Sequence, residues 1–166
     1  MAMLEMAVHA FPKKPGVYTL IVEVAQPIRK KIGKLGFHNF PRGFYTYTGS
    51  AIGLRSLNLR TRIKRHLALR KKEHWHIDYL LNSEVTRISA VIYIETHSKI
   101  ECQIARKLGG LNGGNIIVEG FGSSDCHEGC ESHLHYFEIN FEELSVKVVE
   151  LYEAFGSPRL LIFGNE

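Results

Sequence analysis

Apolar residues run almost without a break through residues 16–24, directly after Pro15. Most of them are β-branched, aromatic or aliphatic, which predicts a buried β-strand. Residues 31–36, in which apolar positions alternate with polar or glycine positions, predict a second strand. A turn at residues 40–43 and the aromatic run at 44–49 predict a third. We therefore expect three antiparallel strands in the N-terminal part of the chain.

The next apolar positions follow a helical period. Leu59, Ile63 and Leu67 are four residues apart and form one stripe, while the other faces of this helix carry basic residues. The remaining segments predict three helices, at 77–81, 98–108 and 145–155, and two strands, at 88–94 and 136–141. With 166 residues and no linker or repeat, we expect a single α/β domain of the α+β type, a small antiparallel or mixed sheet flanked by helices.

Positive charge is concentrated in one segment of a chain whose net charge is only +4. Residues 55–72 contain no acidic residue but eight basic ones, namely Arg55, Arg60, Arg62, Lys64, Arg65, Arg70, Lys71 and Lys72. Such a segment is typical of a phosphate-binding face, although solvated basic helices are common. It indicates a nucleic-acid partner, and the basic residues expected to contact it are Arg55, Arg60, Lys64 and Arg65.

Two histidines, a tryptophan and an aspartate follow directly after the basic segment. We interpret Trp75 as a core residue, and Asp78 as a helix cap or the ion-pair partner of a basic neighbour. His74 and His76 are instead interpreted as nucleic-acid ligands, because imidazole rings can stack on an unpaired base or face the phosphates.

The cysteine pattern and the hydropathy restrict the class of protein. No stretch approaches the 18 or so apolar residues of a membrane span and the N-terminus lacks a signal pattern, so we expect a cytoplasmic protein that does not engage membranes. Cys126, Cys130 and His133 are spaced as in structural zinc sites, but the usual second ligand pair is missing. Cys102 completes a zinc site only if the fold brings it close.

Three motifs resemble the GIY-YIG nucleases, namely Gly16-Val17-Tyr18, Tyr47-Thr48-Gly49 and the run from Leu59 to His66. The resemblance implies a GIY-YIG-like core at about residues 16–108 and a family-specific extension at about 109–166. Residues 74–81 and 120–126 make the whole chain most similar to an uncharacterised family related to these nucleases.

This resemblance implies a metal-dependent endonuclease that hydrolyses phosphodiester bonds, with DNA as the expected substrate. Tyr18 would accept a proton from the attacking water or orient it, and Tyr47 would support Tyr18 by hydrogen bonding. Arg62 would grip the scissile phosphate, and His66, one helical turn later, would act as a second base or a phosphate donor. The matching metal ligand is Glu101, which would hold one Mg²⁺ or Mn²⁺ ion.

These roles have structural alternatives. The two tyrosines could be core residues, and Tyr45 points to the same face as Tyr47 and could take its place. Glu101 follows Ser98 with the spacing of a capping box, so it could serve only to begin a helix. The alternative function is a non-catalytic nucleic-acid-binding module on a nuclease scaffold, with the Cys/His zinc site as a further element.

Overall fold

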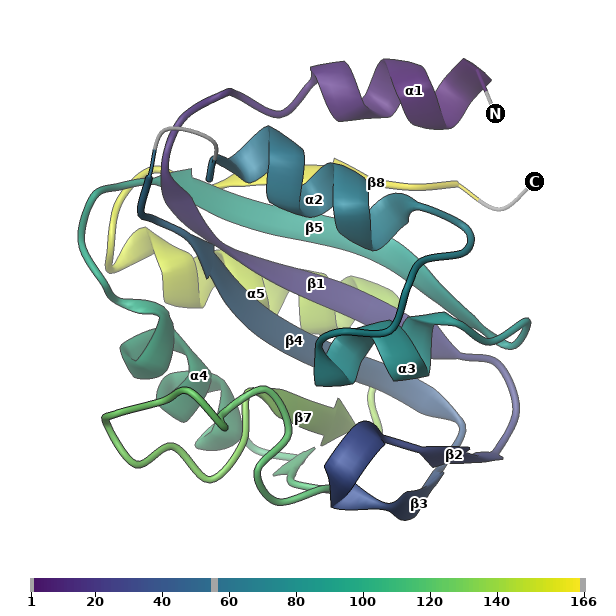
Figure 1. Cartoon of the computed structure of the whole chain (residues 1–166). Helices are drawn as coiled ribbons and strands as arrows, with labels where there is room; N and C mark the ends of the chain where they lie inside the picture. The colour runs from purple at the N-terminus through teal and green to yellow at the C-terminus, as the bar shows by residue number, and fades with distance from the viewer. Residues whose placement is uncertain (1, 55–56, 165–166) are drawn as a thin grey trace.

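The computed structural model describes residues 2–54 and 57–164, so Arg55, one of the predicted nucleic-acid ligands, lies outside the described residues. Within them the chain forms a six-stranded sheet in the order β6-β7-β4-β1-β5-β8, in which all neighbouring strands are antiparallel (Figure 1). The strands are β1 (Gly16–Val24), β4 (Gly43–Ala51), β5 (Thr86–Glu95), β6 (Gly114–Asn115), β7 (Leu134–Phe137) and β8 (Arg159–Ile162).

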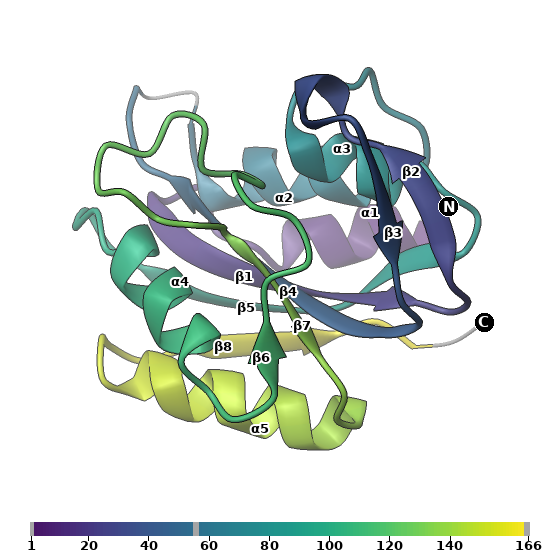
Figure 2. The same cartoon turned by 90° about the horizontal axis from the view of Figure 1, so that it is seen from below.

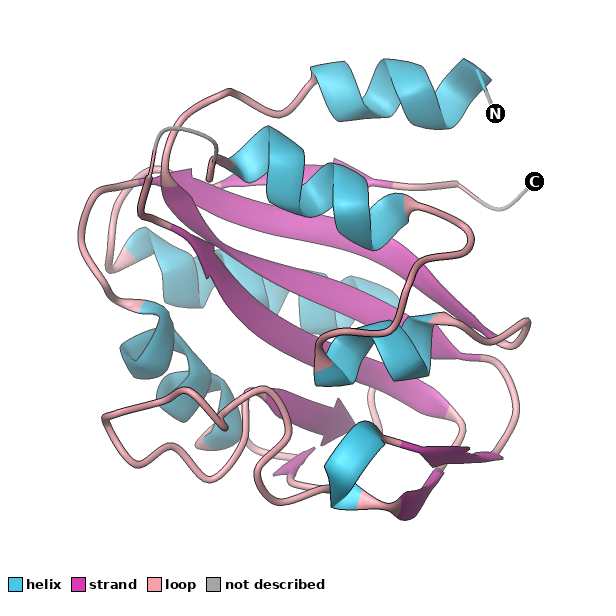
Figure 3. Ribbon diagram, in the orientation of Figure 1, coloured by secondary structure: helices cyan, strands magenta, loops and turns pink. Residues whose placement is uncertain are grey.

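Helices cover both faces of this sheet. The described helices are α1 (Ala2–His9), α2 (Leu59–Leu67), α3 (His76–Leu81), α4 (Glu101–Gly109) and α5 (Phe141–Glu153). Helices α1, α2 and α3 lie on one face, and α5 lies on the other (Figures 2 and 3). The expected fold class, a small sheet flanked by helices, is confirmed. No helix among the described residues is long and apolar enough to cross a membrane.

The central position of β1 explains its continuous apolar sequence. It pairs with β4 on one side and β5 on the other, and both of its faces are covered. Tyr18 and Leu20 point into a core beneath α2 and α3, whereas Val17 and Ile21 point into a second core with α4 and α5. The candidate site therefore forms between the sheet and α2.

Helix α2 follows the predicted stripe. Leu59 and Ile63 are fully buried in the core and Leu67 is packed against it. Asn58 begins the helix, because its side chain accepts a hydrogen bond from the amide of Thr61 at 3.0 Å. The basic residues occupy the outer faces and the end of the helix.

The predicted second strand at residues 31–36 is wrong. Strand β2 (Ile28–Lys31) ends where that strand was expected to begin, a single 3-10 turn spans Gly33–Leu35, and β3 (Phe37–Phe40) returns to pair with β2. The backbone φ angles of Gly33 and Gly36 are +48° and +80°, which a continuous strand cannot have. The two strands form a separate hairpin, not a third strand of the main sheet.

The C-terminal elements also differ from the prediction. Strand β7 ends at Phe137, and α5 begins at Phe141 because the Asn140 side chain caps it through the Glu143 amide at 2.8 Å. The predicted strand at 136–141 therefore extended into a helix. Strands β6, β7 and β8, all from the predicted extension, belong to the same sheet as β1, β4 and β5.

Candidate functional site

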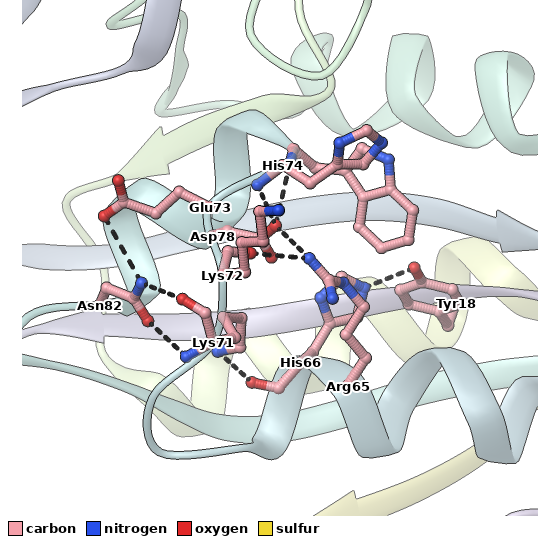
Figure 4. A network of polar contacts seen from close by, with 10 residues as sticks. Tyr18, Arg65, His66, Lys71, Lys72, Glu73, His74, Asp78 and Asn82 are labelled. Atoms are coloured by element: carbon pink, nitrogen blue, oxygen red, sulfur yellow. Dashed lines mark hydrogen bonds and ion pairs between the residues drawn. The ribbon is translucent and has the colours of Figure 1, made fainter.

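Tyr18 and His66 form the centre of the candidate site. The Tyr18 hydroxyl, on β1, lies 2.7 Å from Nε2 of His66 on α2 (Figure 4). Both side chains are nearly buried, at 3% and 2% exposure. Gly49 lies opposite Tyr18 on β4, and a Cβ atom at this glycine would stand 2.6 Å from the tyrosine oxygen. The glycine of the second motif therefore makes room for the tyrosine of the first.

Tyr47 lies on the same face of the sheet as Tyr18. It is opposite Leu20, whereas Tyr18 is opposite Gly49, so the two tyrosines are diagonal neighbours on β1 and β4. The Tyr47 ring meets the His66 ring edge-on, with 6.1 Å between the centroids. The structure thus brings together three residues that the sequence motifs place far apart.

Tyr45 does not share this site. Its hydroxyl donates to the carbonyl of Pro41 at 2.6 Å, and its ring packs against Phe40 and Tyr136. It is fully buried in the core. The interpretation of Tyr45 as an alternative second tyrosine is therefore wrong.

Two charges act on both site tyrosines. Burial raises the pKa of Tyr18 and of Tyr47 above its usual value. The carboxylate of Glu101 raises the pKa of both further, whereas the guanidinium of Arg62 lowers it. Arg62 is placed near the site by its contact with Trp75, whose ring lies 4.4 Å from the Arg62 Cζ atom and 6.1 Å from the His66 ring.

His66 is a neutral imidazole in this setting. The pKa of His66 is lowered to about 3, mainly by burial. Nearby basic side chains also lower this pKa, and the carboxylate of Asp78 raises it. If Nε2 accepts the Tyr18 hydroxyl, the ring proton is on Nδ1. Nδ1 of His66 and Nε of Arg62 are buried without a hydrogen-bond partner among the described residues. An anionic ligand is the kind of group that would satisfy both donors.

Trp75 supports the arginines of α2. The Cζ atom of Arg62 lies 4.4 Å from the centroid of the indole ring, and that of Arg65 lies 4.7 Å from it. Trp75 itself is half-buried and packs against the core. Trp75 was interpreted as a core residue; it packs against the core from outside, and its ring also lies against both guanidinium groups.

The remaining predicted basic ligands differ in what they contact. The Arg65 guanidinium lies 2.7 Å from the buried carboxylate of Asp78, which also accepts the amides of His74 and Trp75 (Figure 4). These bonds outweigh burial and hold the pKa of Asp78 below its usual value, which confirms Asp78 as a cap and ion-pair partner. Lys64 is exposed and has no ion-pair partner among the described residues.

Arg60 and the two histidines are also placed differently. The Arg60 side chain donates to the carbonyls of Phe11 and His9 and so anchors the segment that follows α1. His74 is exposed beside Trp75, with 5.6 Å between the ring centroids. His76 accepts the Gly122 amide at Nδ1 at 2.9 Å, which ties α3 to the loop after β6.

Glu101 is the first residue of α4, and the capping-box interpretation of this residue is wrong. Ile100 occupies the position that begins the helix, without a side-chain cap, and the Ser98 amide donates to the Thr96 hydroxyl. Glu101 is half-buried, and its charge also raises the pKa of His133. It directly precedes Cys102, which belongs to a second group of residues.

That second group is a cluster of three cysteines and a histidine. The sulfur atoms of Cys102, Cys126 and Cys130 and a ring nitrogen of His133 all lie within 4.8 Å of one another. Sγ of Cys102 lies 3.3 Å from Sγ of Cys126 and 3.7 Å from Nε2 of His133. A tetrahedral ion with metal–sulfur bonds of about 2.3 Å would place its sulfur ligands roughly 3.8 Å apart. This cluster could therefore bind a metal ion.

The surroundings of Cys126 favour a thiolate. Burial raises the pKa of this thiol, but the amides of Cys130 and Glu128 and the Cys102 side chain lower it by more. Burial and the neighbouring sulfurs raise the pKa of Cys102. A divalent cation bound to both sulfurs would lower the pKa of both thiols, because a metal-bound thiol is deprotonated.

Most of the chain matches a known protein family. The model of a domain of unknown function, DUF123, matches residues 17–156. The chain belongs to the DUF123 family. No curated protein and no solved structure matches it. The DUF123 match contains the Tyr18 centre, Glu101 and the whole cysteine cluster, so both centres lie within the family domain.

The DUF123 domain also has a polar group that the sequence did not indicate. Thr19 Oγ1 lies 2.9 Å from Thr48 Oγ1 and 2.7 Å from the hydroxyl of Tyr152 on α5. These residues lie on the face of β1 opposite Tyr18. No local pattern relates Thr19 to a tyrosine 133 positions away, so only the fold could identify this group.

Proposed function

We propose that this DUF123 domain is a metal-dependent endonuclease that hydrolyses phosphodiester bonds, with DNA as its substrate. The observation that carries the proposal is that Tyr18 and His66 share a 2.7 Å hydrogen bond, while Arg62 and His66 both pack against the ring of Trp75. A nucleophile activator, a phosphate-binding cation and a metal-binding carboxylate are the groups that this reaction needs.

In this proposal the Tyr18–His66 pair receives the proton of the attacking water. The water oxygen bonds to phosphorus, its proton passes to the Tyr18 oxygen, and the Tyr18 proton passes to Nε2 of His66. The bond to the leaving oxygen then breaks, and that oxygen takes a proton from solvent. The negative charge of the bound phosphate raises the pKa of His66, which favours this transfer.

Arg62 and Tyr47 bind the phosphate in the same proposal. The guanidinium of Arg62 offers several donors, one of which, Nε, is buried without a partner among the described residues. Trp75 limits the freedom of this side chain from one side. The Tyr47 hydroxyl would donate to the phosphate or to the Tyr18 oxygen.

Glu101 would hold the divalent ion, expected to be Mg²⁺ or Mn²⁺. A single carboxylate that is completed by water and substrate oxygens is a common way of binding these ions. Glu101 directly precedes Cys102, whose Sγ lies 3.7 Å from Nε2 of His133, and the carbonyl of His133 accepts the amide of Thr48, the residue after Tyr47. The bound ion would neutralise charge on the phosphoryl oxygens.

We propose Zn²⁺ as the ion of the cysteine cluster, in a structural role. Three sulfurs and one imidazole nitrogen are a usual ligand set for structural zinc, and four protein ligands leave no open position for substrate. The cluster is therefore distinct in chemistry from the oxygen-rich site expected around Glu101.

A non-catalytic nucleic-acid-binding module is the second candidate, and one observation favours it. Tyr18, Tyr47 and His66 are only 3%, 8% and 2% exposed, so substrate can reach them only after a local movement. The two candidates differ in their products. Binding without cleavage supports the module, and cleavage supports the nuclease.

Incubation with labelled branched, nicked and single-stranded DNA and RNA tests the proposal. Each substrate is combined with Mg²⁺, Mn²⁺ or a chelator that removes these ions but leaves the cysteine cluster loaded, as checked by zinc analysis. We expect cleavage of DNA that requires Mg²⁺ or Mn²⁺. Binding of the same substrates without any cleavage would contradict the nuclease and support the module.

A further inference from the structure

We infer that the metal ion of the cysteine cluster is a clamp that fixes Glu101 and the loop over Tyr47 in the candidate active site. This inference rests on the proposed zinc ion, and it assigns that ion a task in the active site beyond general stability. It follows from where the four ligands stand in the fold.

The first ligand is adjacent in sequence to the candidate catalytic carboxylate. Cys102 directly follows Glu101 in the first turn of α4, and this helix start has no side-chain cap. The other ligands come from the loop after β6 and the residue before β7. A bond from the ion to Cys102 therefore adds an anchor at the end of α4 that carries Glu101, where no side chain caps the helix and Ile100 and Ile104 pack against the core.

The same loop also covers Tyr47. The Phe121 ring lies 6.2 Å from the Tyr47 ring, edge-on, and a Cβ atom at Gly122 would stand 2.9 Å from Tyr47. The Gly122 backbone has a φ angle of +70°, so this close approach requires glycine. The loop runs beside α4 in both views (Figures 1 and 2).

The last ligand joins the cluster to the strand of the site. The carbonyl of His133 accepts the amide of Thr48, the residue after Tyr47, at 3.1 Å. The His133 amide in turn donates to Phe121 at 2.8 Å. One ion thus connects the start of α4, the loop over Tyr47 and the strand that carries Tyr47.

A second contact joins the same loop to α4. The guanidinium of Arg106 donates to the carbonyl of Glu128, between two of the cysteines, and lies 3.9 Å from the Glu128 carboxylate. Arg106 is about half exposed, so this contact alone is weak. The ion is the stronger connection between the two segments.

Hydrogen exchange with and without zinc tests the clamp. Purified protein is analysed for bound zinc, and amide exchange is then compared in the zinc form, the chelated form and the refilled form. We expect one zinc per chain and exchange at Thr48, Gly122 and Ile104 that accelerates at least about tenfold on chelation, whereas the amides of the β1–β5 ladder keep their protection.

Variants separate the clamp from a general effect on folding. Cys130→Ser should exchange like the chelated protein, and Cys130→His, which keeps a zinc ligand, should restore the bound ion and most of the protection. His127→Ala is the matched control, because this exposed histidine lies in the same loop outside the cluster. If the serine variant does not fold, the chelated and refilled wild-type protein gives the same comparison.

The possible results distinguish a failure of the clamp from a failure of the proposed nuclease activity. Protein that binds no zinc, exchange that does not change on chelation, or exchange that accelerates equally in the β1–β5 ladder would each overturn the clamp. DNA cleavage that Cys130→Ser retains at the wild-type rate would also overturn it and leave the nuclease intact. The expected exchange pattern without cleavage of any substrate would support the clamp and contradict the nuclease.

Discussion

At the scale of single residues, the site depends on a few close contacts that the sequence motifs could anticipate only in part. The motifs predicted that Tyr18, Tyr47, Arg62 and His66 would meet. The structure brings both tyrosines to His66 and places Arg62 against Trp75, which also packs against His66. The hydrogen bond from Tyr18 to His66 could not be predicted, because it depends on the packing of α2 against β1.

Arg62→Ala is expected to reduce the rate of cleavage at saturating substrate by about 10²- to 10³-fold, because it removes a donor to the phosphoryl oxygens. Single-turnover kinetics measure this rate, and thermal unfolding checks that the fold is retained. The control is Arg29→Ala, since Arg29 also lies over an aromatic ring, 4.8 Å from the centroid of Phe37, but on the separate hairpin. An Arg62→Ala protein of full activity would remove this residue from the site.

His66 should make the fold sensitive to acid. Its pKa is about 3 in the folded chain against 6.5 for an ordinary histidine, so between these values the unfolded chain binds a proton that the folded chain does not. The free energy of unfolding should therefore fall as pH falls from 6.5 to 3, by about 1.4 kcal/mol per pH unit for this group. Urea unfolding at several pH values in this range measures the free energy of unfolding. This free energy should change less steeply with pH for His66→Gln than for wild type or for the exposed control His127→Gln. Equal slopes would show that His66 is not buried in the neutral form.

At the scale of helices and strands, the local pattern of apolar residues was enough to predict elements that bury a long, regular apolar stripe. The run at 16–24 and the stripe at Leu59, Ile63 and Leu67 gave β1 and α2 correctly. The hairpin of β2 and β3 was mispredicted, because two glycines with positive φ angles turn the chain where its apolar alternation suggested a strand. The edge strand β8 was not predicted, since three of its four residues are exposed and its pattern is weak.

Helix α4 shows why the cysteine cluster could be only half predicted. The spacing of Cys126, Cys130 and His133 indicated three ligands, but Cys102 lies 24 residues before Cys126 and no local rule joins them. The fold places it through the packing of Ile104 and Leu108 in the second core.

Glu101→Gln should abolish cleavage that depends on Mg²⁺ or Mn²⁺ and change stability little. The loss of a negative charge in the first turn of a helix costs about 0.3–1 kcal/mol, whereas a hard divalent ion needs the carboxylate itself. Glu142→Gln, in the first turn of α5, is the matched control and should remain active. Ser98→Ala should be harmless, because Ser98 does not cap α4. An active Glu101→Gln protein with unaltered metal dependence would refute the role of Glu101.

At the scale of the whole molecule, the part of the basic segment that the structure describes, residues 57–72, lies on the same side of the sheet as the candidate site. Two of its arginines have structural partners: Arg60 anchors the segment after α1, and Arg65 pairs with Asp78. Lys64 is exposed on α2, the helix that also carries Arg62 and His66. The face suited to a phosphate backbone is therefore narrower than the charge count alone indicated.

DNA binding should weaken linearly with the logarithm of salt concentration, because each neutralised phosphate releases counterions. Lys64→Glu should reduce the slope of log binding constant against log salt concentration by about one unit or more. Lys147→Glu, on α5 across the sheet, should leave the slope unchanged. Fluorescence anisotropy at several salt concentrations measures both, and binding that does not respond to salt would contradict a basic DNA-binding face.

The central claim is that the Tyr18 hydroxyl takes part in phosphodiester hydrolysis. Its most direct test is the single-turnover cleavage rate of Tyr18→Phe beside that of Tyr93→Phe, with the best substrate and Mn²⁺. Tyr93 lies directly opposite Tyr18 on β5 and is also buried, at 6% exposure, so the two variants remove the same atom from adjacent strands. We expect the rate to fall at least about 100-fold for Tyr18→Phe and to stay near wild type for Tyr93→Phe. Equal rates for the two variants would contradict the claim.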